Sequence, residues 1–148
     1  MVDSEGRFVF TIAAIMENPS GEILLLKRSA YKSPVNIWDI VGGGVNQFED
    51  PFDALSREIM EETSIKSYDL IKAIDVFSDK HEDNDIPEMI GITFWCKTIT
   101  KEIYLSDEHT AFKWLKPKEA LAISEHPVVK RNIERFIHEK KRLGLEVE

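Results

Sequence analysis

The chain has 148 residues, of which 43% are hydrophobic, and its formal net charge at pH 7 is −8. This size and apolar content argue against disorder and predict one domain over residues 1–148, with a core at about 8–143. The acidic balance argues against binding to a nucleic-acid polymer, and no apolar run is long enough to cross a membrane. Cys96 is the only cysteine, so no intrachain disulfide forms and we expect a cytoplasmic protein.

Strand-like and helix-like segments alternate along the chain. The segments predicted as strands are Phe8–Met16, Glu22–Arg28, Trp38–Val41, Tyr68–Ser78, Glu88–Thr100 and Thr110–Leu115. A strong turn signal at 18–21 indicates that the first two strands form a hairpin, and the glycines at 42–44 predict a flexible segment. Two later helices are predicted, Pro117–Ile123 and a longer one from Pro127 to a stop at Gly144. Residues 79–87 are predicted to be an exposed polar loop.

The strongest helix signal lies in the middle of the chain. Asp50 is a good N-cap and Pro51 fits the first helical position. At helical spacing, Phe52, Leu55 and Ile59 form one apolar side, which we expect to face the core.

Three glutamates crowd the neighbouring side of this helix. Glu58, Glu61 and Glu62 stand at i, i+3 and i+4, a spacing that stacks them together. Two unit charges about 4 Å apart cost roughly 1 kcal/mol in water and roughly 4 kcal/mol near a protein surface. Arg57 alone cannot offset this repulsion, whereas a divalent cation could. Carboxylate donors with no His or Cys among them favour Mg²⁺ or Mn²⁺ over zinc, although an ordinary solvated acidic face has the same pattern.

The wider spacing carries a family resemblance. From Gly43 to Ile65 the chain follows G-x5-E-x7-R-E-U-x-E-E-x-G-U, where U is apolar, with Ser64 in place of the last glycine. This pattern is similar to the Nudix box. The flanking features that such proteins share are here Arg28 at the end of the hairpin, the segment 38–43, and Glu108 ahead of Trp114.

The resemblance implies an α+β fold, the Nudix α/β/α sandwich with a mixed β-sheet between helices. It also implies Mg²⁺-dependent hydrolysis of a nucleoside diphosphate linked to another moiety, with Mn²⁺ as the alternative ion. The implied metal ligands are Glu58, Glu61, Glu62 and the carbonyl of Gly42. One glutamate would help to generate the nucleophile, and the sequence leaves open which one.

Other site residues follow from the same resemblance. Arg57 would orient the box glutamates, and Glu49 would tie the preceding loop to the helix. Glu108 is a candidate distal ligand or base, with an ordinary turn as the alternative. Arg28 and Gly43 are candidate substrate contacts, and for Arg28 a solvated charge at a strand end is the alternative.

Three residues depart from the family pattern: Val41 replaces a proline, and Phe48 and Ser64 replace glycines. We expect Ser64 to adopt a positive φ, at a cost of roughly 1 kcal/mol. The short chain favours the branch similar to MutT, which acts on (oxidised) nucleoside triphosphates. We expect a monomer or a homodimer. The alternatives are a catalytically silent Nudix-fold module that binds a nucleotide or protein and, ranked last, an isomerase that would need Cys96 as its thiol.

Overall fold

The computed structural model describes residues 5–80 and 85–148, so part of the predicted loop at 79–87 lies outside the described residues. Its elements follow the predicted order closely. They are β1 (Phe8–Glu17), β2 (Ile23–Arg28), β3 (Trp38–Asp39), β4 (Val41–Gly44), α1 (Pro51–Thr63), β5 (Asp69–Asp79), β6 (Glu88–Lys97), β7 (His109–Leu115), α2 (Pro117–Ile123) and α3 (Pro127–Arg142). The predicted helix stop is confirmed, since α3 ends just before Gly144, whose φ is +74°.

Within the described residues the strands form one mixed sheet centred on β1. The strand order is β3-β2-β1-β6-β5, with β4 paired to β1 and β7 paired to β2. β1 runs parallel to β6 along its whole length and antiparallel to β4. The predicted β1–β2 hairpin is confirmed but short, with Glu17 paired to Ile23, because β4 pairs with β1 from Thr11 to Ala14.

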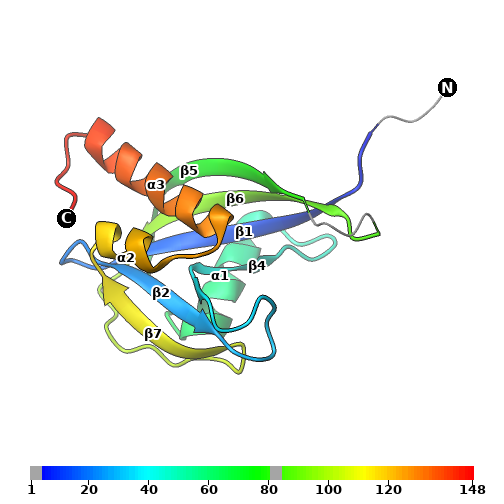
Figure 1. The fold of residues 1–148 in the computed structure, drawn as a ribbon, viewed down its shortest axis with the longest axis horizontal. Helices are drawn as coiled ribbons and strands as arrows, with labels where there is room; N and C mark the ends of the chain where they lie inside the picture. The colour runs from blue at the N-terminus through cyan, green and yellow to red at the C-terminus, as the bar shows by residue number, and fades with distance from the viewer. Residues whose placement is uncertain (1–4, 81–84) are drawn as a thin grey trace.

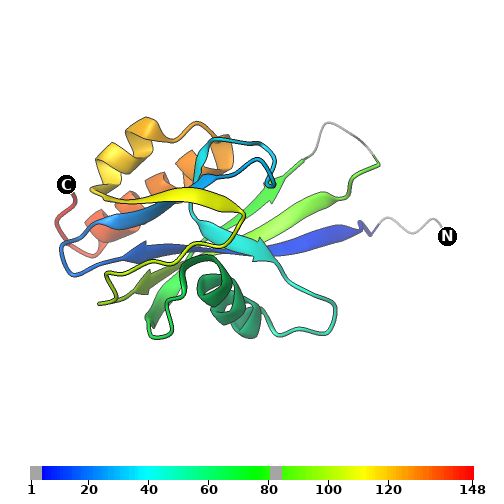
Figure 2. The ribbon, with the colours of Figure 1, turned by 90° about the horizontal axis from the view of Figure 1, so that it is seen from below.

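The sheet lies between helices, as Figures 1 and 2 show: α1 covers one face, and α2 and α3 cover the other. Side chains of β1 alternate between the two resulting cores. Ile12 and Met16 join the core beneath α1, whereas Ile15 joins the core beneath α2 and α3. This alternation follows from the two-residue period of a strand, and it explains why β1 is largely apolar. The predicted α/β/α sandwich is therefore confirmed.

Helix α1 begins as the sequence predicts. The side chain of Asp50 accepts a hydrogen bond from the backbone N–H of Phe52, and Pro51 occupies the first turn. Leu55 and Ile59 are fully buried, but Phe52 is 57% exposed, so its predicted place on the core side is wrong. Phe52 lies in the first turn, where its ring packs near Phe94 with ring centroids 5.7 Å apart.

The glycines that follow β3 form a strand and are not the predicted flexible segment. β4 pairs with β1 through residues such as Gly42, opposite Ala13. A Cβ placed on Gly42 would lie 2.6 Å from the carbonyl oxygen of Ile12, so glycine allows the two backbones to approach closely. The described residues contain no helix that is both long and apolar enough to span a membrane.

Candidate active site

The three box glutamates lie on the face of α1 that approaches β4, and they differ in their exposure to solvent. Glu58 and Glu62 are buried, whereas the side chain of Glu61 is 57% exposed. Burial raises the pKa of Glu62 to about 7, and it also raises the pKa of Glu58 above its ordinary value. The carboxylates at 58 and 62 therefore need a cationic or hydrogen-bonding partner to stay ionised inside the protein.

Strand β4 provides a bare backbone surface for these carboxylates. A Cβ placed on Gly43 would lie 2.3 Å from the carboxyl group of Glu58, so any larger residue would displace it. The backbone N–H of Gly42 donates a hydrogen bond to Oε1 of Glu62 at 2.8 Å. The contact seen at Gly42 is through its N–H, and its carbonyl remains a predicted ligand.

Arg57 fastens the loop, the strand and the helix together. Its Nε and Nη2 donate to the two carboxylate oxygens of Glu49 at 2.8 and 2.9 Å, and Nη2 also donates to the carbonyl of Gly44. Its Nη1 donates to Glu58 Oε1 at 2.7 Å and reaches Glu61 at 3.4 Å. The hydrogen bond from Arg57 lowers the pKa of Glu49 to about 2. The predicted tie between Glu49 and the helix is thus made by Arg57.

A lysine and a second acidic residue complete the other side of Glu62. Lys32, from the loop between β2 and β3, places its Nζ 3.1 Å from Oε2 of Glu62 and 3.6 Å from Oε2 of Glu108. Burial acts to lower the pKa of Lys32, but the charges of Glu62 and Asp39 outweigh it and raise that pKa above its ordinary value. Nothing in the local sequence distinguishes Lys32, which is one cation in a polar loop.

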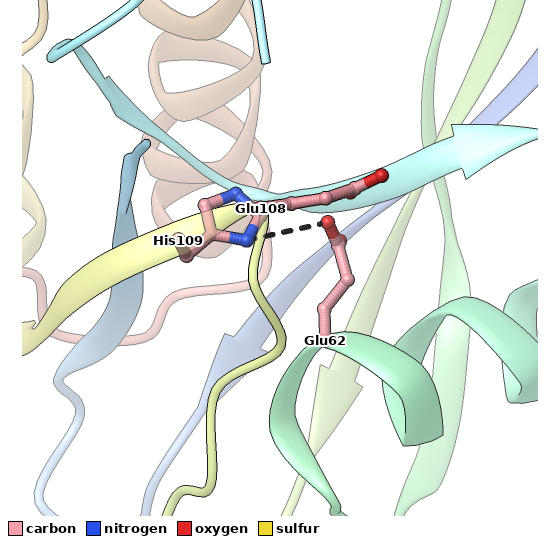
Figure 3. A group of neighbouring side chains, drawn as sticks. All are labelled: Glu62, Glu108 and His109. Atoms are coloured by element: carbon pink, nitrogen blue, oxygen red, sulfur yellow. Dashed lines mark ion pairs between the residues drawn. The ribbon is translucent and has the colours of Figure 1, made fainter. Parts of the chain in front are cut away.

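His109, at the start of β7, also faces Glu62 (Figure 3). Its Nδ1 lies 3.5 Å from Oε2 of Glu62, and its side chain is fully buried. Neither ring nitrogen has a hydrogen-bond partner among the described residues. Burial lowers the pKa of His109 to about 4, so the imidazole is neutral at pH 7. Glu108 is a predicted site residue, whereas its neighbour His109 is not, because its position depends on the pairing of β7 with β2.

Glu62, Glu108 and His109 together offer three ligand atoms that lie within 4.8 Å of one another. This donor set fits a divalent cation: its two carboxylates suit Mg²⁺ and Mn²⁺, whereas the His109 imidazole is a ligand that zinc and other transition metals favour. The unpartnered nitrogens of His109 support the fit.

Arg28 lies at the end of β2 and has partners within the protein. Its Nε donates to Oδ2 of Asp39 at 2.7 Å, and its Nη1 donates to the carbonyl of Ser33 at 2.8 Å. The alternative of a solvated charge at a strand end is therefore wrong. The two contacts tie the end of β2 to β3 and to the loop that carries Lys32. A contact of Arg28 with substrate stays a prediction.

Two of the departures from the family pattern lie at positions of positive φ. Ser64 follows α1 with φ 63°, as predicted, and its N–H bonds to the carbonyl of Met60. Phe48 has φ 67°, and its side chain is 98% exposed. A positive φ suits glycine, which is the residue that the family pattern has at both positions.

Comparison with known proteins agrees with this geometry. The family model of the NUDIX domain matches residues 7–136. An RNA pyrophosphohydrolase from Afipia carboxidovorans is 31% identical over 88 residues, which cover 57% of this chain and 50% of that protein. Another, from Bartonella clarridgeiae, is 36% identical over 66 residues, 41% of this chain and 38% of that protein. The crystal structure of a MutT protein from Methanosarcina mazei Go1 has a TM-score of 0.80 and 27% identity, covering 94% of this chain and 99% of that one.

The α/β/α sandwich, the acidic face of α1 and the match over residues 7–136 define the class: the chain belongs to the Nudix family. The resemblance seen in the sequence is confirmed. The chain spans half the length or less of these curated relatives.

Proposed function

We propose that this protein is a Mg²⁺-dependent pyrophosphohydrolase that cleaves a nucleoside diphosphate linked to another moiety, with (oxidised) nucleoside triphosphates as favoured substrates. The observation that carries the proposal is the packing of Glu58 and Glu62 against the side-chain-free strand at Gly42 and Gly43. Two buried carboxylates held against a backbone without side chains bring oxygen donors together at one place, as a hard divalent cation requires. Membership of the Nudix family supports the same reaction class.

The roles of the residues follow from their contacts. Glu58, Glu61 and Glu62 would hold Mg²⁺, or Mn²⁺ as the alternative, together with the carbonyl of Gly42. When bound, the ion would neutralise phosphate oxygens and lower the pKa of an attacking water. Arg57 keeps the carboxylate of Glu58 in one orientation through its 2.7 Å hydrogen bond.

The residues at the rim of the site have proposed roles as well. Glu108, whose side chain is 53% exposed, would act as a further ligand or as the base. Gly43 would let the substrate approach the backbone of β4. Arg28 would contact a phosphate group if the loop between β2 and β3 moves, because its guanidinium is now bonded to Asp39.

The alternative of a silent binding module is less well supported. A module that only binds a ligand has no need for three carboxylates that repel one another, and here two of them are also buried at a cost in desolvation. The isomerase alternative loses its thiol, because Cys96 is fully buried in the core beneath α1 and burial raises its pKa to about 12.

The test is a substrate panel with Mg²⁺ or with EDTA, following phosphate and pyrophosphate release. The panel holds canonical and oxidised nucleoside triphosphates, nucleotide sugars, ADP-ribose, dinucleoside polyphosphates and a 5′-triphosphorylated RNA. The RNA is included because the relatives are named RNA pyrophosphohydrolase, whereas the charge of this chain predicts that no nucleic-acid polymer binds. Inactivity of the wild-type protein on every substrate would favour the binding module.

Variants then assign the site. Glu61→Gln and Glu62→Gln should each lower kcat by about 100-fold or more on the substrate that the wild-type protein hydrolyses fastest. The matched control is Glu134→Gln, an exposed glutamate on α3, across the sheet from the site. Wild-type rates in both box variants, with the control also unchanged, would refute the metal-site assignment.

A further inference from the structure

The loop between β2 and β3 brings an internal cation into the acidic cluster. Lys32 Nζ donates a hydrogen bond to Oε2 of Glu62 at 3.1 Å and lies 3.6 Å from Glu108. The other oxygen of Glu62, Oε1, is already bonded to the N–H of Gly42. Oε2 is also the oxygen of Glu62 that faces His109, at 3.5 Å. Lys32 therefore uses the one oxygen of Glu62 that is directed toward the other candidate ligands.

Hydrogen bonds of residues before and after Lys32 in the chain hold this lysine in position. On one side, the backbone N–H of Ser29 donates to the carbonyl of Glu108 at 2.7 Å, and the Ser29 hydroxyl donates to the carbonyl of Asp107 at 2.6 Å. On the other side, the carbonyl of Ser33 accepts from Arg28. The segment that carries Lys32 is thus fastened to the segment that carries Glu108, and the ammonium group is held where the two meet.

We propose that Lys32 is a built-in competitor for the divalent cation: its ammonium group neutralises Glu62 and Glu108 and must leave before an ion can bind between Glu62, Glu108 and His109. The inference rests on the proposed function, because it concerns the same acidic site. An ammonium group and a divalent cation cannot share the Oε2 atom of Glu62 at bonding distance, since both carry positive charge in a poorly solvated space. Displacement frees the ammonium group of Lys32 to interact with the phosphate chain of a substrate.

Because of this competition, the wild-type protein should bind the metal ion more weakly than the same metal-ligating residues would without the Lys32 ammonium group. Removing the ammonium group should therefore tighten metal binding, whereas removing a lysine that only stabilises the site would loosen it. The sign of the change separates these two roles for Lys32. The same substitution leaves Glu62 buried without its cation, so it should also destabilise the protein when no metal is present.

The experiment is calorimetric titration of Mn²⁺ into the wild-type chain, Lys32→Gln and Lys72→Gln. Lys72 is the matched control, because it also pairs with one glutamate, Glu139 at 2.6 Å, but on the α3 side of the sheet. We expect Lys32→Gln to bind Mn²⁺ about tenfold more tightly than the wild-type chain, and Lys72→Gln to bind within about twofold of it. Affinity in Lys32→Gln that equals or falls below the wild-type value would overturn the inference.

A second measurement does not depend on affinity alone. In EDTA, Lys32→Gln should melt at a lower temperature than Lys72→Gln, and saturating Mn²⁺ should raise its melting temperature more than it raises that of the other two proteins. Equal metal-dependent shifts in all three proteins would count against the competition. If all three bind Mn²⁺ with equal affinity, the inference fails and the metal site stands. If none binds Mn²⁺, the metal site of the proposed function fails as well.

Discussion

The glycines of β4 provide a sharp test of the site, because an added methyl group has different surroundings at each of the three positions. At Gly43, the new Cβ would lie 2.3 Å from the Glu58 carboxyl carbon and from one of its oxygens. At Gly42, it would lie 2.6 Å from the backbone carbonyl oxygen of Ile12. At Gly44, it would meet nothing within 4 Å. Alanine at these positions should therefore separate an effect on the site from an effect on the fold.

The size of the effect at Gly43 follows from the distances. Ordinary contact begins at about 3.4 Å, so Gly43→Ala must move the Glu58 carboxyl group by about 1 Å. That group is the end of a side chain and can move, but it then loses the 2.7 Å hydrogen bond from Arg57. A displacement of about 1 Å in a reacting group can cost about 100-fold in rate. We expect Gly43→Ala to lower kcat by about that factor while the protein stays folded.

The assay measures kcat on the best substrate of the panel, together with the melting temperature of each variant. Gly44→Ala should match the wild-type protein in both. Gly42→Ala should lower the melting temperature, because the Ile12 carbonyl belongs to the backbone of β1 and overpacking there costs about 1–3 kcal/mol. If Gly43→Ala were as active as Gly44→Ala, Glu58 would have no role in the chemistry, and the arrangement on which the proposed function rests would be wrong.

Three further predictions concern residues around the site and in the core. Arg57→Lys should lower kcat by about 10–100-fold with little change in melting temperature, because an ammonium group cannot bond Glu49 and Glu58 in the forked geometry of the guanidinium; steady-state kinetics would show it. Ser64→Gly should raise the free energy of unfolding by up to about 1 kcal/mol in urea titrations, since φ is 63°, and a loss of stability would refute this. Lys140→Met should lower the free energy of unfolding by about 3–5 kcal/mol, because it leaves the buried carboxylate of Glu17 without its cation; adding Glu17→Gln should restore part of the loss.

The parts of the structure that local sequence determines were predictable. The cap at Asp50, the helix that follows it and the positive φ of Ser64 depend on residues that are close neighbours in the chain. The carboxylates of Glu58 and Glu62 were also predictable, since helical spacing alone places them on one face of α1. The burial that distinguishes them from Glu61 was not, because it depends on how closely β4 approaches the helix.

His109 could not have been placed from the sequence for a different reason. It reaches the site because β7 pairs with β2, which sets His109 opposite Arg28. These residues are far apart in the chain, and the pairing of two such strands leaves no local signal. Lys32 depends likewise on the hydrogen bonds between Ser29 and the segment at 107–108.

The contacts of Lys32 also change the electrostatic argument for a metal ion. From the sequence, one arginine faced three carboxylates and could not balance them. In the structure, Arg57 forms an ion pair with Glu58, Lys32 forms one with Glu62, and the charge of the exposed Glu61 is screened by solvent. Charge balance alone therefore does not require an ion. An ion is instead favoured by the kind of contact: Arg57 makes several hydrogen bonds that fix its place, whereas Lys32 brings one flexible ammonium group to the oxygen that a divalent cation would need.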